Sequence, residues 1–449
     1  MKKAALHNLG CKVNAYETEA MQQLLEQAGY EIVPFTEQAD VYVINTCSVT
    51  NMADRKSRQM LHKAKKENPD SIVVAAGCYV QTSSEEAARD LSVDIIIGND
   101  KKHELVELIE NCMNQKKNAN EETEGVDDWK ENICDINEKG RAYEALSISR
   151  TEEHTRAFLK VQDGCNQFCT YCIIPYARGR IRSRKAEEVV HEVETLAANG
   201  CKEVVLTGIH LSSYGLDHGD NLLHLIQEVH KVEGIRRIRL GSLEPGIIDE
   251  NFVKELAKLE KICPHFHLSL QSGCDATLKR MNRKYDTATY EAGCKLIRKY
   301  FTHPAITTDV IVGFPGETEE EFEETMQFAE QIGFSKIHIF KYSMRKGTPA
   351  AKMEHQVADS IKTERSEKLE KLNEKLEENY RRCFLEQEEE VLMEERILVD
   401  GQRYFVGHTR EYLKIAVVTE EDLENKMVQV RVKKMLNKEI LLAEIVKIY

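Results

Sequence analysis

Three cysteines with short, regular spacing are the residues in this chain best suited to hold a metal cluster. Cys165, Cys169 and Cys172 lie within residues 163–175, which read Asp-Gly-Cys-Asn-Gln-Phe-Cys-Thr-Tyr-Cys-Ile-Ile-Pro. Cysteine thiolates hold iron–sulfur clusters, and three thiolates leave one iron of a four-iron cluster without a protein ligand. A small molecule can bind such an open iron, so the spacing predicts a cluster that also binds a cofactor.

Two other uses of cysteine compete with this interpretation. A structural zinc site needs four ligands, but the next cysteine, Cys201, falls in a different predicted element, after a helix and a glycine. A disulfide framework is typical of short secreted chains, whereas this chain has 449 residues and an odd 13 cysteines. His7 and Asn8 interrupt the apolar start, and no signal-peptide cleavage site follows. We therefore expect a cytoplasmic protein with reduced thiols.

The first part of the chain alternates apolar strands with amphipathic helices. Strands are predicted over 4–9, 41–46, 72–76 and 95–97, with helices over 17–27 and 53–66. This alternation is typical of an α/β layer with a mostly parallel sheet.

Three further cysteines lie at equivalent places in this predicted sheet. Cys11, Cys47 and Cys78 each directly follow the end of a strand. The carboxyl ends of parallel strands share one edge, where ligands bind, so the three thiols are expected to converge. Buried cysteines that act only as small apolar side chains are the alternative. The equivalent positions, and the glycines before Cys11 and Cys78, favour a second three-thiolate cluster.

A second α/β unit is predicted over 151–380, with the first cysteine loop directly after its first strand. Six strand-like runs, at 157–162, 203–207, 236–240, 265–270, 306–312 and 336–342, alternate with helical stretches. This pattern predicts a partial (β/α)6 barrel with its active site at the carboxyl ends of the strands.

Composition and charge limit the partners. A net charge of −14 argues mildly against nucleic acid. However, Arg178, Arg180, Arg182 and Arg184 alternate directly beyond the cysteine loop, where they could grip a phosphate backbone. A solvated basic segment that pairs with surface acids is the alternative. No apolar run approaches the length that crosses a bilayer, so no membrane is expected.

The domain prediction places an N-terminal domain at 1–113, a polar linker at 114–150, the barrel at 151–380 and a C-terminal domain at 381–449. The linker is acidic and weakly apolar. The last segment alternates β-branched and polar residues, which predicts a small antiparallel β-barrel. The chain is therefore expected to be an α/β multidomain protein.

The sequence resembles the radical S-adenosylmethionine methylthiotransferases over nearly its whole length. The motifs that carry the resemblance lie at 10–14, 45–50, 77–79, 164–175, 269–273 and 309–317. Residues 206–210, 239–245 and 342–349 resemble the branch that acts on N6-threonylcarbamoyladenosine in tRNA. Cys274 stands where that branch and its relatives commonly carry serine, and we interpret it as a structural cysteine.

The resemblance implies two [4Fe-4S] clusters, S-adenosyl-L-methionine, and a C-terminal TRAM domain that binds RNA. It implies that the cluster on Cys165, Cys169 and Cys172 cleaves the cofactor, and that the cluster on Cys11, Cys47 and Cys78 presents sulfur. No side chain is expected to be catalytic, because the radical comes from the cofactor. By analogy with the barrel family, Gly208, Glu244, Val312 and Gly313 could contact the cofactor, although barrel-end residues can also simply satisfy backbone groups.

The implied reaction adds a methylthio group to C2 of N6-threonylcarbamoyladenosine at position 37, 3′ of the anticodon. The partners would be the tRNA anticodon loop and an electron donor that reduces the clusters. The same reaction on N6-isopentenyladenosine, or methylthiolation of a ribosomal-protein aspartate, stays open. A non-catalytic iron–sulfur protein that binds RNA is a further alternative, and cleavage of S-adenosylmethionine would exclude it.

Overall fold

Continuous apolar runs form the strands of the N-terminal sheet in the computed structural model, which describes residues 1–118, 131–138, 140–151 and 155–449. The strands β3 and β4 are buried along their whole length, as is typical of a parallel sheet covered on both faces. All the pairings are parallel, in the order β2-β1-β3-β4-β5-β6. The strands are β1 (Lys3–Asn8), β2 (Glu31–Ile32), β3 (Val41–Thr46), β4 (Ile72–Gly77), β5 (Ile95–Ile97) and β6 (Glu131–Asn132).

Both predicted helices of this layer are present, although the first begins five residues earlier than predicted, and further helices follow. The helices are α1 (Lys12–Gln27), α2 (Asn51–Glu67), α3 (Cys78–Thr82), α4 (Ser84–Ala88), η1 (Lys102–Glu104) and α5 (Leu105–Asn118). Helix α2 starts where the Thr50 side chain accepts a hydrogen bond from the Ala53 amide, an N-cap that satisfies a free backbone donor.

The predicted linker is partly wrong. Helix α5 runs five residues into it, as far as Asn118, and β6 pairs with β5 as the sixth strand of the sheet. Leu146 and Ile148 are buried against the central barrel. The apolar side chains of this segment are few and widely spaced, so the segment has no periodic pattern that would predict a strand or helix. It nevertheless adds a strand to the N-terminal sheet and apolar side chains to the core of the barrel. Residues 119–130 and 139 of the predicted linker lie outside the described residues.

The central part is the predicted partial barrel, and all six predicted strands are present. They are β7 (Arg156–Asp163), β9 (Glu203–Gly208), β10 (Arg237–Leu240), β11 (His265–His267), β12 (Ala305–Val312) and β13 (Lys336–Lys341). Parallel pairing runs through β7, β9 and β10, and through β11, β12 and β13. Single parallel bridges, such as Leu243 with Leu268, join the two halves. A short strand, β8 (Arg182–Ser183), pairs antiparallel with β7.

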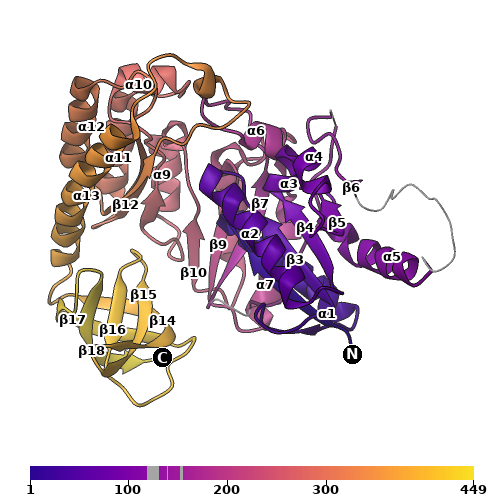
Figure 1. Cartoon of the computed structure of the whole chain (residues 1–449). Helices are drawn as coiled ribbons and strands as arrows, with labels where there is room; N and C mark the ends of the chain where they lie inside the picture. Colours follow the sequence, from indigo (N-terminus) through magenta and orange to yellow (C-terminus); the bar gives the residue numbers. More distant parts are fainter. Residues whose placement is uncertain (119–130, 139, 152–154) are drawn as a thin grey trace.

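Helices cover the outside of this barrel and bury its apolar core. They are α7 (Ala186–Ala198), α8 (Leu222–Lys231), α9 (Glu250–Leu256), α10 (Asp275–Arg280), α11 (Thr287–Tyr300) and α12 (Glu319–Ile332). The first barrel strand, β7, also packs against α1 of the N-terminal layer. Figure 1 shows this layer, in indigo and purple, beside the β7–β10 half of the barrel.

The long helix α13 (Asp359–Arg382) leads to the C-terminal barrel, drawn in yellow in Figure 1. The barrel is closed in the order β14-β15-β16-β18-β17. Four of its pairings are antiparallel, as predicted, but β16 and β18 pair in parallel. The strands are β14 (Glu388–Val399), β15 (Gln402–Thr409), β16 (Lys414–Val417), β17 (Met427–Met435) and β18 (Ile440–Ile448). Among the described residues, no helix combines the length and the apolar character needed to cross a bilayer.

Buried charges dock the C-terminal barrel onto the amino ends of the central strands. Arg239 donates to the backbone carbonyls of Arg410 and Thr409, at 2.9 and 3.2 Å. Its Nε also donates to Glu203 at 2.8 Å. Arg156 and Arg239 both lie over the ring of Tyr412, 5.0 and 4.8 Å from its centroid. Glu203 therefore neutralises the arginines that hold the two barrels together.

We expect Glu203→Gln to loosen this junction. Although burial opposes ionisation, the charges of Arg239 and Arg156 lower the pKa of Glu203 to about 2. Its stabilising effect should be complete above about pH 4.5 and fall as the pH drops toward 2. The variant should lose about 3 kcal/mol or more at neutral pH, because it leaves buried arginines without their carboxylate. Urea unfolding, repeated from pH 7 to pH 3, measures both effects.

Glu388→Gln is the matched control, because its partner Arg431 is solvent-exposed and such pairs contribute about 1 kcal/mol or less. Equal losses in the two variants, or an unchanged pH dependence in Glu203→Gln, would contradict the role of Glu203.

Candidate metal centres and substrate cavity

The sheet topology brings the first three predicted ligands together. Cys11, Cys47 and Cys78 follow β1, β3 and β4, which are adjacent parallel strands. The chains approach so closely that a Cβ on Gly10 would lie 3.0 Å from the Cys47 Sγ. Gly10 and Gly77 also have φ values of +114° and +98°, which only glycine adopts without strain. These three thiols, here called the N-terminal trio, converge at one edge of the sheet.

The second set of predicted ligands lies in the loop between β7 and α6 (Ile174–Ala177). Here called the central trio, it consists of Cys165, Cys169 and Cys172. The Cys172 amide donates to the Cys169 carbonyl at 3.0 Å, and the Gln167 amide to the Cys165 Sγ at 3.4 Å. Burial raises the pKa of the Cys165 thiol to about 11 and that of Cys172 to about 12, and the neighbouring thiols add to both shifts.

The donor atoms of both trios fit an iron–sulfur cluster. Each trio offers three thiols that lie close enough to interact electrostatically. Among the described residues, no three His, Cys, Asp or Glu side chains lie as close as a single metal ion requires. In the described part of the chain, no fourth cysteine is among the main electrostatic partners of the thiols of either trio. Each arrangement therefore suits a cluster with one open iron, and the assignment of the six cysteines as ligands stays a prediction.

A buried arginine connects the N-terminal trio to the strand that precedes the central trio. Arg178 donates from Nε to the Cys78 Sγ at 3.4 Å and from Nη2 to Asn14 at 2.7 Å. Its Nη1 pairs with Glu17 of α1 at 2.6 Å and with Asp163 at 3.4 Å. Asp163 ends β7, two residues before Cys165. One guanidinium thus contacts both the N-terminal layer and the strand that carries the central trio.

Further buried cations surround the same two carboxylates. Lys160 lies 2.8 Å from Glu17 and 2.7 Å from Asp163. Lys102 lies 3.3 Å from Glu17, and Arg182 lies 3.7 Å from Asp163. These six residues are here called the ionic cluster. Despite the opposing effect of burial, the cations hold the pKa of Glu17 well below its usual range and lower that of Asp163 to about 2.

The ionic cluster carries more positive than negative charge, because four cations face two carboxylates. Cysteine ligates a metal as the thiolate, so a cluster on three thiolates brings negative charge beside Cys78. The excess of buried positive charge matches this requirement and supports the fit of the N-terminal trio to such a group.

The predicted arginine stripe is wrong at three of its four positions. Arg178 is fully buried in the ionic cluster, and Arg182 is buried beside it. Arg184 is buried and pairs with Glu192 of α7. Buried side chains that are paired with interior carboxylates cannot reach a phosphate backbone. Arg178 and Arg184 instead contact side chains of α1, and Arg182 lies beside the carboxylate at the end of β7.

Arg180 is exposed and remains a candidate for RNA contact. Its guanidinium lies 4.5 Å from the centroid of the Phe168 ring, within the loop of the central trio. Phe168 in turn meets Tyr176 edge to face at 6.2 Å, and Tyr176 is 45% exposed. Arg180, Phe168 and Tyr176 form a stacking platform beside the central trio.

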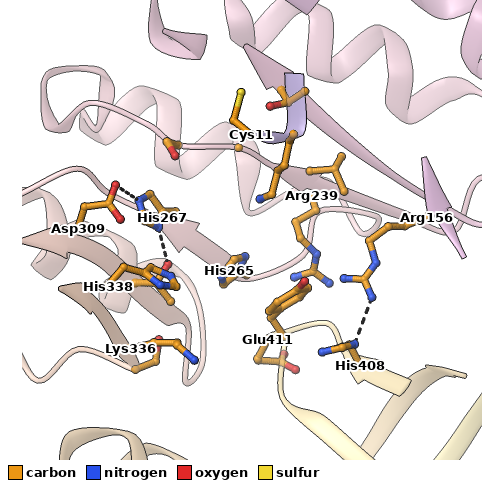
Figure 2. Close-up of a pocket in the computed structure, with 18 of the residues that line it drawn as sticks. Cys11, Arg156, Arg239, His265, His267, Asp309, Lys336, His338, His408 and Glu411 are labelled. Atoms are coloured by element: carbon orange, nitrogen blue, oxygen red, sulfur yellow. Dashed lines mark hydrogen bonds and ion pairs between the residues drawn. The ribbon is translucent and has the colours of Figure 1, made fainter. Parts of the chain in front are cut away.

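A large cavity lies inside the barrel, with a volume of about 760 Å³. It extends from Gly10, Cys11 and Lys12 to Tyr412 of the C-terminal barrel. Figure 2 shows Cys11 above the cavity, Arg239 and Arg156 on one side, and His267, Asp309 and His338 on the other. His267 lies 3.3 Å from Asp309. The N-terminal trio therefore opens into the barrel interior through Cys11.

Two of the predicted cofactor contacts lie near the trios. Gly208 ends β9 and lines the cavity. Glu244 accepts from Arg283 at 2.5 Å, and the same guanidinium donates to the Cys169 Sγ at 3.1 Å. Although burial opposes it, the nearby His210, 3.6 Å away, and the charge of Arg283 lower the pKa of Glu244. A cofactor-binding role for Gly208 and Glu244 stays a prediction.

The other two predicted contacts are internal. The Val312 side chain is fully buried, and the Val312 carbonyl accepts from the Tyr342 amide at 2.9 Å. The Gly313 amide donates to Glu317 at 2.6 Å, and a Cβ there would lie 2.3 Å from Lys362 of α13. Neither residue lines the cavity. Glu244 does not line it either, and a cofactor-binding role for Val312 and Gly313 stays a prediction.

The charged interior of the barrel was missed from the sequence. Arg239, His265, His267, Asp309 and His338 all line the cavity. Arg237 and Arg239, His265 and His267, and Lys336 and His338 alternate with apolar residues along their strands, and this period of two was the available signal. Strands of a filled barrel normally point bulky apolar side chains inward, so these polar inward positions indicate a site.

Two family models match the two main parts of the fold. The model described as "Radical SAM superfamily" matches residues 159–329, within the central barrel. The model described as "Uncharacterized protein family UPF0004" matches residues 3–98, within the N-terminal layer.

Comparison with solved structures supports the fold. The radical S-adenosylmethionine methyltransferase TsrM from Kitasatospora setae aligns with a TM-score of 0.57 and 16% identity. The alignment covers 78% of this chain and 77% of that one, and that structure has cobalamin and a [4Fe-4S] cluster bound. At this identity the likeness concerns the fold alone.

Two curated relatives are much closer in sequence. The threonylcarbamoyladenosine tRNA methylthiotransferase MtaB of Bacillus subtilis (strain 168) is 43% identical over 97% of this chain and 94% of its own length. The tRNA-2-methylthio-N(6)-dimethylallyladenosine synthase of Alkaliphilus oremlandii is 35% identical over 96% of this chain and 90% of its own. The chain therefore belongs to the radical S-adenosylmethionine methylthiotransferase family.

Arg178→Met should selectively weaken the N-terminal trio. The substitution removes the cation that contacts Cys78 and leaves Glu17 and Asp163 with less buried positive charge. After anaerobic reconstitution we expect about half of the wild-type iron, because the central trio keeps its own contacts. Iron per chain and visible absorption measure the loss.

Arg184→Met is the matched control, since it removes an equally buried arginine that touches Glu192 and Tyr16 and no cysteine. Full iron in Arg178→Met, or the same loss in Arg184→Met, would contradict the role of Arg178 at the N-terminal trio.

Proposed function

We propose that this protein adds a methylthio group to C2 of N6-threonylcarbamoyladenosine in tRNA, at position 37 next to the anticodon. The observation that carries the proposal is the pair of three-thiol sites, of which Arg178 connects the first to the strand that precedes the second. The C2–H bond of adenine is not acidic enough for a side-chain base, so the reaction needs cofactor chemistry. Two open clusters would provide two separate roles: one cleaves the cofactor to form the radical, and the other presents the sulfur.

S-adenosyl-L-methionine and two [4Fe-4S] clusters, when bound, supply the radical, the sulfur and the methyl group. The chain itself holds and orients these groups. Cys165, Cys169 and Cys172 hold one cluster, and Cys11, Cys47 and Cys78 hold the other. Arg283 anchors both Cys169 and Glu244, so the cofactor side of the site keeps one geometry. The docked C-terminal barrel contributes His408, Tyr412 and Lys414 to the lining of the cavity.

The RNA contacts are proposed for the platform of Arg180, Phe168 and Tyr176 and for the C-terminal barrel. Unpaired bases stack on aromatic rings and on arginine, and the anticodon loop presents such bases. The target base is already outside a duplex, so little free energy is needed to turn it into the cavity. Phe168 of the platform lies in the loop of the central trio, so RNA bound to the platform would lie beside the site of reaction.

The charge of the cavity favours the threonylcarbamoyl substrate over the dimethylallyl one. Six lysine and arginine side chains line it, against four carboxylates. The threonylcarbamoyl group carries a carboxylate, whereas a dimethylallyl group is apolar and gains most from an apolar wall. The higher identity to the relative named for threonylcarbamoyladenosine agrees with this preference.

The thiols must stay reduced until the clusters assemble, which favours the cytoplasm as the site of action. Reductive chemistry at the clusters also requires an electron donor, which we propose as a further partner.

Mass spectrometry of nucleosides from total tRNA tests the proposal. Cells that lack the gene should lose the methylthio form of N6-threonylcarbamoyladenosine and accumulate the unmodified parent. The intact chain should restore it, and a chain with Cys172→Ala should not. If the dimethylallyl nucleoside loses its methylthio group instead, the substrate is wrong while the chemistry stands. No change in either nucleoside would contradict a tRNA substrate.

A further inference from the structure

Lys12 is the cation of the cavity that has no hydrogen-bonding or ion-pair partner among the described residues. It follows Cys11 directly and lines the cavity where the N-terminal trio opens into it. The positive charges of Arg239 and Arg156 act on it, as does the negative charge of Asp309, which itself lies against His267. An ammonium group with no carboxylate in direct contact is placed to receive an anion.

The other five cations of the cavity already have carboxylate partners. Arg239 pairs with Glu203, and Arg156 with Glu203 and Glu394. Lys336 and Arg381 pair with Glu377, at 3.9 and 2.8 Å, and Lys414 lies 3.7 Å from Glu395. Asp309 is the carboxylate that reaches the upper cavity, and it is held by His267 at 3.3 Å. Of the six cations that line the cavity, Lys12 is therefore the one that has no carboxylate partner in the described part of the chain.

The proposed substrate offers a matching anion. The N6-threonylcarbamoyl group ends in a carboxylate, and its ureido N–H can hydrogen-bond to N1 of the adenine. That bond places the threonyl group along the base edge that also carries C2. A base whose C2 faces the sulfur-bearing trio would thus bring the carboxylate to the same end of the cavity. Lys12 lies at that end, because it follows Cys11 in the chain.

We propose that the Lys12 ammonium binds the carboxylate of the threonylcarbamoyl group and so selects this nucleoside over neutral N6 substituents. The inference rests on the proposed function and names the residue that sets its substrate specificity. An ammonium–carboxylate contact at the wall of the cavity discriminates between substrates, because a neutral substituent cannot pair with the ammonium group.

Binding of anticodon stem-loop RNAs to the holoenzyme, measured without S-adenosylmethionine, tests this proposal. Three RNAs differ only at position 37, which carries N6-threonylcarbamoyladenosine, its methyl ester, or unmodified adenosine. Wild-type protein should prefer the free carboxylate over the ester by about tenfold to a hundredfold. Lys12→Gln should bind all three RNAs nearly equally, and Lys12→Arg should keep most of the preference.

Lys336→Gln is the matched control, because it removes a cavity lysine that is already paired with Glu377. It should leave the preference unchanged. Equal iron content in all variants shows that the neighbouring trio is intact. A preference that survives in Lys12→Gln, or equal binding of acid and ester by the wild type, would overturn the role of Lys12. The nucleoside analysis of whole cells decides the proposed function separately, since it does not depend on this residue.

Discussion

The buried ionic cluster around Arg178 is the interaction on which the rest of the site depends. Charges without water are costly to bury unless they are paired, and removal of one partner leaves the others uncompensated. Glu17, from α1, and Asp163, at the end of β7, can therefore stay buried as charged groups only while the N-terminal layer and the barrel stay together. Because Arg178 also contacts Cys78, the same ion pairs fix the N-terminal trio relative to the strand that carries the central trio. Two sites from separate layers are thereby held around one substrate.

A second set of buried charges closes the opposite end of the barrel. Arg156, Arg237 and Arg239 converge on Glu203. Arg237 and Arg239 hold the C-terminal barrel through its backbone carbonyls, and Arg156 holds it through the side chain of Glu394. The barrel interior is consequently polar and wide, in contrast to the apolar side-chain layers that fill a typical α/β barrel. This polar lining costs stability in the empty protein, but it provides charged groups for a substrate that is itself charged. The ion pairs of the junction and the free ammonium of Lys12 are parts of the same lining.

The sequence predicted the strands well, because runs such as 41–46 and 203–207 are apolar, short and bounded by glycine or polar residues. The glycine and cysteine positions also predicted that Cys11, Cys47 and Cys78 would converge. The arginine stripe was predicted wrongly, since the burial of Arg178 depends on Glu17, which lies 161 residues away in the chain. Likewise, β6 forms only because β5 offers an open edge, and its own two residues carry no strand pattern. Long-range contacts of this kind decide whether a charged residue faces water, and local periodicity does not report them.

The central claim is that the two trios have different roles in one reaction. The most direct test measures 5′-deoxyadenosine and the methylthiolated nucleoside in the same assay. Purified Cys47→Ala and Cys169→Ala proteins would be reconstituted with iron and sulfide and supplied with reductant, S-adenosylmethionine and substrate tRNA. The account predicts that Cys47→Ala still forms 5′-deoxyadenosine but makes no methylthiolated nucleoside, whereas Cys169→Ala makes neither. Loss of both products in both variants, with the other trio still loaded with iron, would contradict the division of roles.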